Sequence, residues 1–437
     1  MSKQSEQISL LRFDDEVKKN YRWNFTCNLL DWVFFSMGMS FASVNTVLPA
    51  FARHLTSSNF LIGFIPCLST MGWLLPQILI ANFVQKLKRK KDLIIFTGVG
   101  ERIPWLFLFL VVMFLPFSSS FLLITFLILY ALFSFSGGVG GPAWQDMLAK
   151  VIPLKKRGRF FGWSNFLAGG VGIFAAFLSI HLLKSFSFPK NFALCFLFAF
   201  AATSVSYIFF ILIREPIYPV KNKKSSLKEY FLQLPSLLKK DNNFSSFLIA
   251  TIFLSYGGMA TAFFAVYAMN KLILPDSQIG IFTLLLLIGQ TISSILWGYL
   301  GDRKGYKLIM EIGTLLTILA ILLAILSSSI HLFYGVFFIF GWALSASFIS
   351  SMGVILEFST PEMRPTYIAL SNTVKAPFVS LSPLLGGFLI DRTSFPFVFI
   401  LTIFVLLGGF LYLALLVREP RHLLPHLPGR YLTKRRI

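Results

Sequence analysis

Four ionisable side chains stand inside long apolar runs of this sequence: Asp31, Glu101, Arg102 and Lys375. A charge placed in hydrocarbon costs at least about 2.5–3.5 kcal/mol, so each of them should face protein or water. Lys375 follows Pro365 by ten residues, or ~15 Å of helical rise, which is near the middle of a membrane. Such groups can bind an anion or carry a proton. The structural alternative is mutual pairing, with Glu101 or Asp31 held against Arg102 or Lys375.

Small and polar residues recur at steps of three and four in four of the apolar runs. Each such stripe indicates either close helix packing or one wall of a water-filled cavity. The stripes are Asn24, Asn28, Asp31, Phe35, Gly38, Ala42 and Asn45; Tyr130, Ser134, Gly137, Gly141 and Gln145; Trp342, Ala346, Ser350, Gly353 and Glu357; and Asn372, Lys375, Val379, Ser382 and Gly386.

The high hydrophobic content of the chain indicates which kind of structural element carries these residues. Hydrophobic side chains make up 56% of the chain and charged ones 13%, whereas a soluble domain is about 25% charged. The apolar runs approach the roughly 20 residues of a spanning helix and exceed the about 10 of a barrel strand. We predict an all-α membrane protein with twelve spans, at about 25–51, 60–85, 92–115, 119–149, 159–183, 190–213, 244–270, 277–300, 306–327, 331–358, 366–390 and 395–416.

Lys and Arg are distributed unevenly along the chain, whose formal net charge is +21. With Met1 placed inside, 32 of the 39 fall on the inner side and five on the outer side. This bias predicts that both termini are cytoplasmic. The positive charge therefore reflects the orientation of the chain in the membrane and can attract it to the lipid bilayer. It does not indicate a nucleic-acid partner. We expect a multi-pass protein of a bacterial inner membrane.

The residue pattern does not favour cofactor chemistry. Cys27, Cys67 and Cys195 lie in separate helices and the five histidines are scattered, so we expect no metal site. The glycine runs at 98–100 and 137–141 lie inside hydrophobic spans, which excludes nucleotide-binding loops there. An intramembrane enzyme would need a nucleophile with a base, and the spans hold no such set. We therefore expect that the protein uses no cofactor, is not driven by ATP and is not an enzyme.

Two short patterns repeat about 200 residues apart. Leu-Ile-Arg-Glu-Pro at 212–216 returns as Leu-Val-Arg-Glu-Pro at 416–420, and the segment from Pro153 has a counterpart from Pro361. This duplication predicts two pseudo-symmetric six-helix bundles, at 24–214 and 244–417. A cytoplasmic segment at 1–23, a linker at 215–243 and a basic tail at 418–437 complete the chain.

Trp297–Lys307, between the eighth and ninth predicted helices, reads Trp-Gly-Tyr-Leu-Gly-Asp-Arg-Lys-Gly-Tyr-Lys. It resembles the loop signature of the major facilitator superfamily, Gly-x-Leu-(Ala/Gly)-Asp-Arg-x-Gly-(Arg/Lys)-(Arg/Lys), with Tyr306 as the one departure. Twelve helices in duplicated halves extend the resemblance over almost the whole chain. The resemblance implies a transporter whose halves rock about a central cavity.

The same loop indicates a cytoplasmic latch that closes between the halves. Asp302 can face the positive end of a neighbouring helix, which the family's pseudo-symmetry implies is the helix that begins near Gly158. Glu357 is within reach of Arg303 or Lys307. Glu311 is four residues after Lys307, so we expect these two to form a structural pair.

The latch should be lopsided because Lys86 stands where the first half should carry the aspartate. Asp146 can still pair with Arg157, Arg159 or the Lys88–Lys91 run. The expected latch residues are Gly298, Gly301, Asp302, Arg303, Gly305, Lys307, Asp146, Arg157, Arg159, Glu357 and Arg364. The alternative is a solvated basic loop that only sets topology.

The resemblance implies that the four stripes lie on helices lining the central cavity, so we expect them to share an aqueous site. Its candidate substrate and coupling residues are Asp31, Asn28, Glu101, Arg102, Tyr130, Asn372 and Lys375. Lys375 would neutralise an anionic group of the substrate, and Asp31 would carry a proton.

We therefore predict a monomeric secondary transporter that moves a small organic anion or zwitterion by alternating access, coupled to protons or another ion. A lipid or amphiphile flippase, or a multidrug exporter, of the same fold is the alternative. The segment Ala168–Gly172 lacks the Gly-Pro pair that marks many drug antiporters of the family, which weakens the exporter alternative. A receptor or scaffold would tolerate loss of the buried charges.

Overall fold

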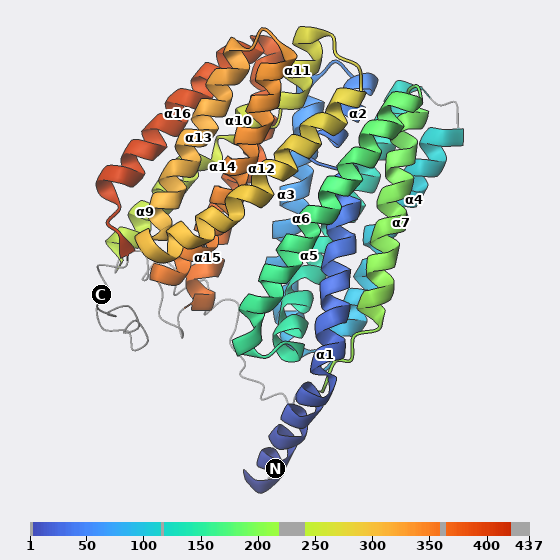
Figure 1. The fold of residues 1–437 in the computed structure, drawn as a ribbon. Helices are drawn as coiled ribbons and strands as arrows, with labels where there is room; N and C mark the ends of the chain where they lie inside the picture. Colours follow the sequence, from blue (N-terminus) through green and yellow to red (C-terminus); the bar gives the residue numbers. More distant parts are fainter. Residues whose placement is uncertain (1–2, 115–117, 218–240, 359–363, 421–437) are drawn as a thin grey trace.

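The computed structural model describes residues 3–114, 118–217, 241–358 and 364–420, and every regular element in these ranges is a helix (Figure 1). The first half contains α1 (Lys3–Phe41), α2 (Val47–Leu55), α3 (Asn59–Lys86), α4 (Lys91–Phe114), α5 (Ser119–Val151), α6 (Leu154–Ser185) and α7 (Lys190–Ile211). The second contains α9 (Asn242–Ser255), α10 (Gly258–Thr261), α11 (Phe264–Leu272), α12 (Ser277–Lys304), α13 (Tyr306–Leu326), α14 (Ile330–Phe358), α15 (Arg364–Arg392) and α16 (Phe395–Leu416).

The predicted all-α fold of twelve spans is confirmed. Eleven of the described stretches are long and apolar enough to cross a membrane, and α1 with α2 supplies the remaining crossing. Two segments differ from the prediction in detail. The polar N-terminal segment is already helical from Lys3 onward, and the seventh span is divided into α9, α10 and α11. The break between α9 and α10 falls beside Gly257 and Gly258, because glycine is a poor helix former, and a second break follows at Ala262 and Phe263.

The two halves touch at one end of the molecule. We call the end at which α1 begins and α16 ends the inner end, and the opposite end the outer end (Figure 1). Near the outer end, a Cβ on Gly387 of α15 would lie 2.2 Å from the Asn59 carbonyl oxygen of α3. A Cβ on Gly280 of α12 would lie 2.6 Å from the Ile180 side chain of α6. Glycine therefore permits two close seams, α3 with α15 and α6 with α12.

The distance between α6 and α12 increases toward the inner end. Midway along α6, Gly169 still lies against the Thr291 side chain of α12. Nearer the inner end, a Cβ on Gly162 or on Gly298 would meet nothing within 4 Å. Figure 1 shows that the two bundles are also farther apart toward the inner end. Within the described residues, the halves are thus closed together at the outer end and parted at the inner end.

The repeated Arg-Glu-Pro pattern places a carboxylate at an equivalent helix start in each half. Glu215 accepts the N–H groups of Lys90 and Lys91 at 2.9–3.0 Å and the Lys150 ammonium at 3.0 Å. In the second half, Glu419 lies against Gly305, which precedes α13 and has φ +100°. Glu215 satisfies helix N–H groups, and a carboxylate at either position can complement the helix dipole.

We predict that Glu215→Ala destabilises the protein by about 3 kcal/mol, because it leaves a half-buried ammonium and two helix N–H groups without their acceptor. Thermal unfolding of the purified protein measures this effect. Glu16→Ala, which removes an exposed carboxylate from α1, should change stability by less than about 0.5 kcal/mol. Equal melting temperatures for the two variants would contradict the capping role.

Candidate functional site

Three of the four ionisable residues within the spans meet inside the first half. Arg102 of α4 donates to Glu101 Oε2 at 2.5 Å. Its Nη2 lies 3.3 Å from the Ser206 hydroxyl of α7, which donates to Asp31 Oδ1 of α1 at 2.7 Å. We call Asp31, Glu101, Arg102 and Ser206 the buried charge cluster. The pairing of Glu101 with Arg102 is the arrangement that the structural alternative described, and Ser206 links Asp31 to the same guanidinium.

Arg102 is held by contacts from α1, α4 and α7. Its Nε donates to the Thr203 carbonyl at 3.2 Å and its Nη1 to the Gly98 carbonyl at 3.1 Å. The guanidinium also lies 5.7 Å from the Phe35 ring centroid and 4.9 Å from that of Tyr207. Cation–π contacts and hydrogen bonds together replace the hydration that the guanidinium loses on burial.

The cluster is unbalanced in charge. It contains two carboxylates and one guanidinium, so its net charge is negative when all three groups are ionised. Asp31 is 7% exposed and Arg102 8% exposed, while the Glu101 side chain, at 15%, is the most accessible member. Uptake of one proton would make the cluster neutral. Within the described ranges, no three His, Cys, Asp or Glu residues gather as a metal site.

The described contacts of the stripe on α1 form a packing seam, and a role for this stripe in lining an aqueous site stays a prediction. Asn24 donates to the Arg214 carbonyl at 2.9 Å and accepts the Arg214 N–H at 2.8 Å, which ties α1 to the chain just after α7. Gly38 lies against Thr203 of α7. Asn28 is fully buried and donates to the Asn24 carbonyl at 2.7 Å. The Asn24 side chain and the Asn28 amide N–H thus find partners within the half, whereas Asn28 Oδ1 is buried without a hydrogen-bond partner in the described part of the chain.

The stripes on α5 and α14 also lie in seams along much of their length. Gly137 and Gly141 face Trp73 and Gln77 of α3, and Gly353 lies against Tyr306 of α13. Tyr130 is 3% exposed and lies in an aromatic group with Trp105, Phe126 and Phe133. The structure therefore does not bring Tyr130 to the charge cluster. Small residues bring helices close in a membrane, which explains why these stripes look like cavity walls in sequence.

Lys375 lies in the other half, on α15, and takes no part in the charge cluster. Its side chain is half-buried and, among the residues that the structure describes, has neither a hydrogen-bond partner nor an ion-pair partner. Asn372, one turn nearer the inner end, is exposed. Farther along the same stripe, Gly386 packs onto Met259 at the start of the α10 region. The outer part of this stripe is thus a seam, whereas Asn372 and Lys375 stand where the seam ends.

The expected latch residues of the second half make contacts within that half. Asp302 accepts a hydrogen bond from the Tyr306 hydroxyl at 3.0 Å, and the Arg303 guanidinium lies 4.2 Å from the Tyr299 ring centroid. Lys307 pairs with Glu311 at 3.2 Å, as predicted. Gly301 and Gly305 lie against Tyr306 and Glu419, respectively, while Gly298 has open space beside it.

Two further latch residues lie beside helix starts. Glu357 Oε2 is 3.5 Å from the Tyr306 N–H. Asp146 pairs with Lys90 at 3.4 Å, which confirms its predicted partner among Lys88–Lys91. The side chains of Arg157, Arg159 and Arg364 lie outside the described residues. A latch that joins the two halves therefore remains a prediction.

Sequence reasoning missed the α7 side of the charge cluster. Thr203, Ser206 and Tyr207 stand at steps of three and four, which places them on one helix face. The Tyr207 hydroxyl donates to the Ile95 carbonyl of α4 at 2.7 Å. This short polar stripe was a usable signal, because three hydroxyl groups on one face of an apolar helix need partners.

Comparison with known families identifies the chain. The family model described as Major Facilitator Superfamily matches residues 30–271 and 247–432. The chain therefore belongs to the major facilitator superfamily, as its loop signature suggested.

Solved structures share the fold at low sequence identity. The nucleoside transporter NupG, in a mutant form, gives a TM-score of 0.71 at 13% identity, covering 91% of this chain and 100% of that one. The D-xylose-proton symporter gives a TM-score of 0.70 at 14% identity, covering 92% and 99%. A bacterial homologue of the human lysosomal transporter Spinster, in an inward-facing and unoccupied conformation, gives 0.66 at 15% identity, covering 91% and 97%. The family and these neighbours are membrane transporters.

One curated relative matches over a shorter segment. A probable peptide/nitrate transporter of Arabidopsis thaliana is 36% identical over 107 residues, which is 24% of this chain. The chain covers 21% of that relative's length.

We predict that Arg102→Met lowers the unfolding free energy by about 3–5 kcal/mol, because two buried carboxylates then lose their cation. Adding Glu101→Gln to Arg102→Met should restore at least about 1 kcal/mol, since it removes one of the uncompensated charges. Thermal unfolding of both variants gives the comparison, with Arg303→Met as an exposed control. An unfolding curve for the double variant at or below that of Arg102→Met would show that charge balance is not what Arg102 provides.

Proposed function

We propose that this protein is a secondary transporter that exposes a central site to the two sides of the membrane in turn and moves a small organic anion or zwitterion. Lys375 carries the proposal. It is the ionisable residue at depth that has no partner in the described part of the chain. An unpaired ammonium in a span is costly, so a substrate carboxylate or other anionic group is its natural partner.

The position of Lys375 supports this assignment. It lies ~15 Å along the helix from Pro365, near the membrane midplane, where transporters of this architecture place their substrates. The inner end is where the two halves part, and exposed Asn372 lies between Lys375 and that end. Asn372 can supply an amide donor and acceptor beside the ammonium.

The buried charge cluster is the proposed coupling site. With two carboxylates against one guanidinium, it changes from a net negative charge to neutrality on taking up one proton. Ser206 can serve both protonation states of Asp31, because its hydroxyl donates to a carboxylate and can accept from a carboxylic acid. Glu101, whose side chain is the most accessible of the cluster, is the member best placed to exchange a proton with water. One of the solved neighbours is the D-xylose-proton symporter.

The remaining assignments follow from charge placement. The excess of Lys and Arg at the inner end supports cytoplasmic termini. In the outward-open state the inner ends of the two halves approach each other. Asp302 and its neighbours would then form the latch between the halves. One chain contains both halves and the whole proposed site, which supports a monomer as the working unit.

We predict that Lys375→Met abolishes transport without lowering protein abundance, because the substrate's anionic group loses its counter-charge. Uptake of a panel of radiolabelled organic anions and zwitterions into proteoliposomes measures this. Lys375→Arg, which keeps the charge, should retain part of the activity, and Lys184→Met, at an exposed outer position, should retain all of it. Wild-type uptake by Lys375→Met would overturn the substrate assignment. Selective transport of lysolipids would favour the flippase alternative.

We predict that Asp31→Asn removes acid-driven accumulation while leaving substrate exchange at equal pH on both sides. The amide cannot take up and release a proton, but the binding site in the other half is untouched. Proteoliposomes with an internal pH dye report both processes, and Asp15→Asn, exposed on the same helix, is the control. Accumulation by Asp31→Asn that still follows the pH gradient would exclude Asp31 as the coupling carboxylate.

A further inference from the structure

Asp391, at the outer end of α15 in the second half, binds the start of a helix in the first half. Its Oδ1 accepts the Asn59 N–H at 2.8 Å and the Asn59 side-chain amide at 2.9 Å. Its Oδ2 accepts the Phe60 N–H at 2.9 Å and the Ser58 hydroxyl at 3.0 Å. One carboxylate thus satisfies four donors at the N-terminus of α3, where negative charge is also favoured by the helix dipole.

A second carboxylate of the same half makes the equivalent contact across the molecule. Asp276 occupies the N-cap position of α12, yet its side chain does not cap that helix. It lies instead against the first half, where Oδ1 is 2.8 Å from His54 Nε2 and Oδ2 accepts from the Asn191 amide at 3.1 Å. The His54 ring is stacked on Phe188, with centroids 4.4 Å apart, which fixes its orientation.

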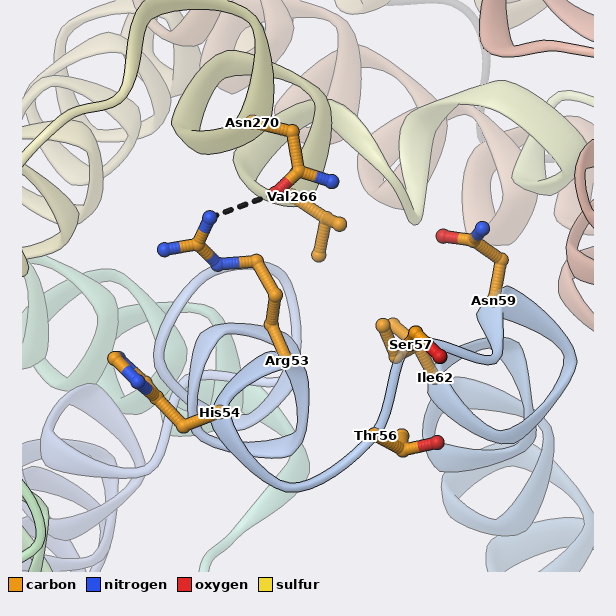
Figure 2. Close-up of a pocket in the computed structure, with 8 residues that line it drawn as sticks. All are labelled: Arg53, His54, Thr56, Ser57, Asn59, Ile62, Val266 and Asn270. Atoms are coloured by element: carbon orange, nitrogen blue, oxygen red, sulfur yellow. Dashed lines mark hydrogen bonds between the residues drawn. The ribbon is translucent and has the colours of Figure 1, made fainter.

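Both contacts lie at the outer face, beside a pocket whose lining includes their partners His54 and Asn59. This pocket of about 300 Å³ lies between the halves and is lined by residues of α2, α3 and α11, including Arg53, His54, Asn59 and Asn270 (Figure 2). The Arg53 Nη1 donates to Asn270 Oδ1 across this pocket at 2.7 Å. Water can therefore replace the contacts when they separate, which keeps their rupture inexpensive.

We infer that Asp391 and Asp276 are gating residues: two carboxylate clamps that hold the outer end shut and set the balance between the inward-open and outward-open forms. All four oxygens come from the second half and their donors come from the first half. Rocking of the halves must break both clamps before the outer end can open. This inference rests on the rocking of the halves put forward in the proposed function.

The α3 start is suited to repeated release. Ser58 is the N-cap of α3, and its hydroxyl also accepts the Leu61 N–H at 3.4 Å. The helix therefore keeps a cap of its own when Asp391 withdraws, and the Asn59 and Phe60 N–H groups pass to water. The clamp can open without unwinding the helix.

The test measures the distance between the halves at both ends by pulsed electron spin resonance on the full-length protein. Spin labels at Lys184→Cys and Ser328→Cys report the outer end, and labels at Lys88→Cys and Lys304→Cys report the inner end; all four positions are exposed. The three native cysteines are buried, so they should not take up label. The variants are Asp391→Asn and Asp391→Ala, with Asp92→Asn as the matched control, because Asp92 is an exposed carboxylate in the first turn of α4.

We expect Asp391→Asn to raise the outward-open to inward-open ratio by about fivefold, and Asp391→Ala by at least as much, with no change in Asp92→Asn. The outer distance should lengthen as the inner one shortens. If the wild type shows both the outward-open and the inward-open population and the Asp391 variants have the same ratio, the gating role of Asp391 is wrong. Rocking of the halves would still stand. A single unchanging pair of distances in every variant and at every pH would count against rocking itself.

Discussion

Ionised side chains at the depth of hydrocarbon must be matched by partners within the protein or by water, and this constraint organises both halves of the molecule. In the first half the constraint is met internally. Arg102 gathers Glu101, Ser206 and, through Ser206, Asp31, and two aromatic rings cover its faces. In the second half it is not met within the described chain, because Lys375 stands alone on α15. This asymmetry separates the proposed coupling site from the proposed substrate site.

The same asymmetry appears between the two ends of the molecule. At the outer end, glycine seams and the carboxylates Asp391 and Asp276 hold the halves together. At the inner end each half is braced separately, by Glu215 at the start of α4 and by Glu419 beside Gly305. Contacts that join the halves can be exchanged during transport, whereas contacts within a half keep each bundle rigid.

Much of the fold followed from the sequence because span length and charge bias depend on the membrane itself. The partners of Arg102, Lys307 and Asp146 were also accessible, since they lie nearby in sequence or form obvious opposite charges. The stripes left two interpretations open for a physical reason. A period of 3.6 residues identifies the face that carries Asn28 or Tyr130, but it does not identify the neighbour, and a glycine seam and a wet wall have the same composition. Asp391 and His54 escaped notice because their partners lie in the opposite half.

Lys375 as the binding partner of an anionic group on the transported solute is the central claim. A thermal-shift screen of purified wild-type protein and the Lys375→Met variant against a metabolite library tests it most directly, because a ligand that binds only the folded form raises its melting temperature. We predict that stabilising compounds carry a carboxylate or another anionic group and lose their effect in Lys375→Met. Neutral or cationic compounds that stabilise both proteins equally would contradict the claim.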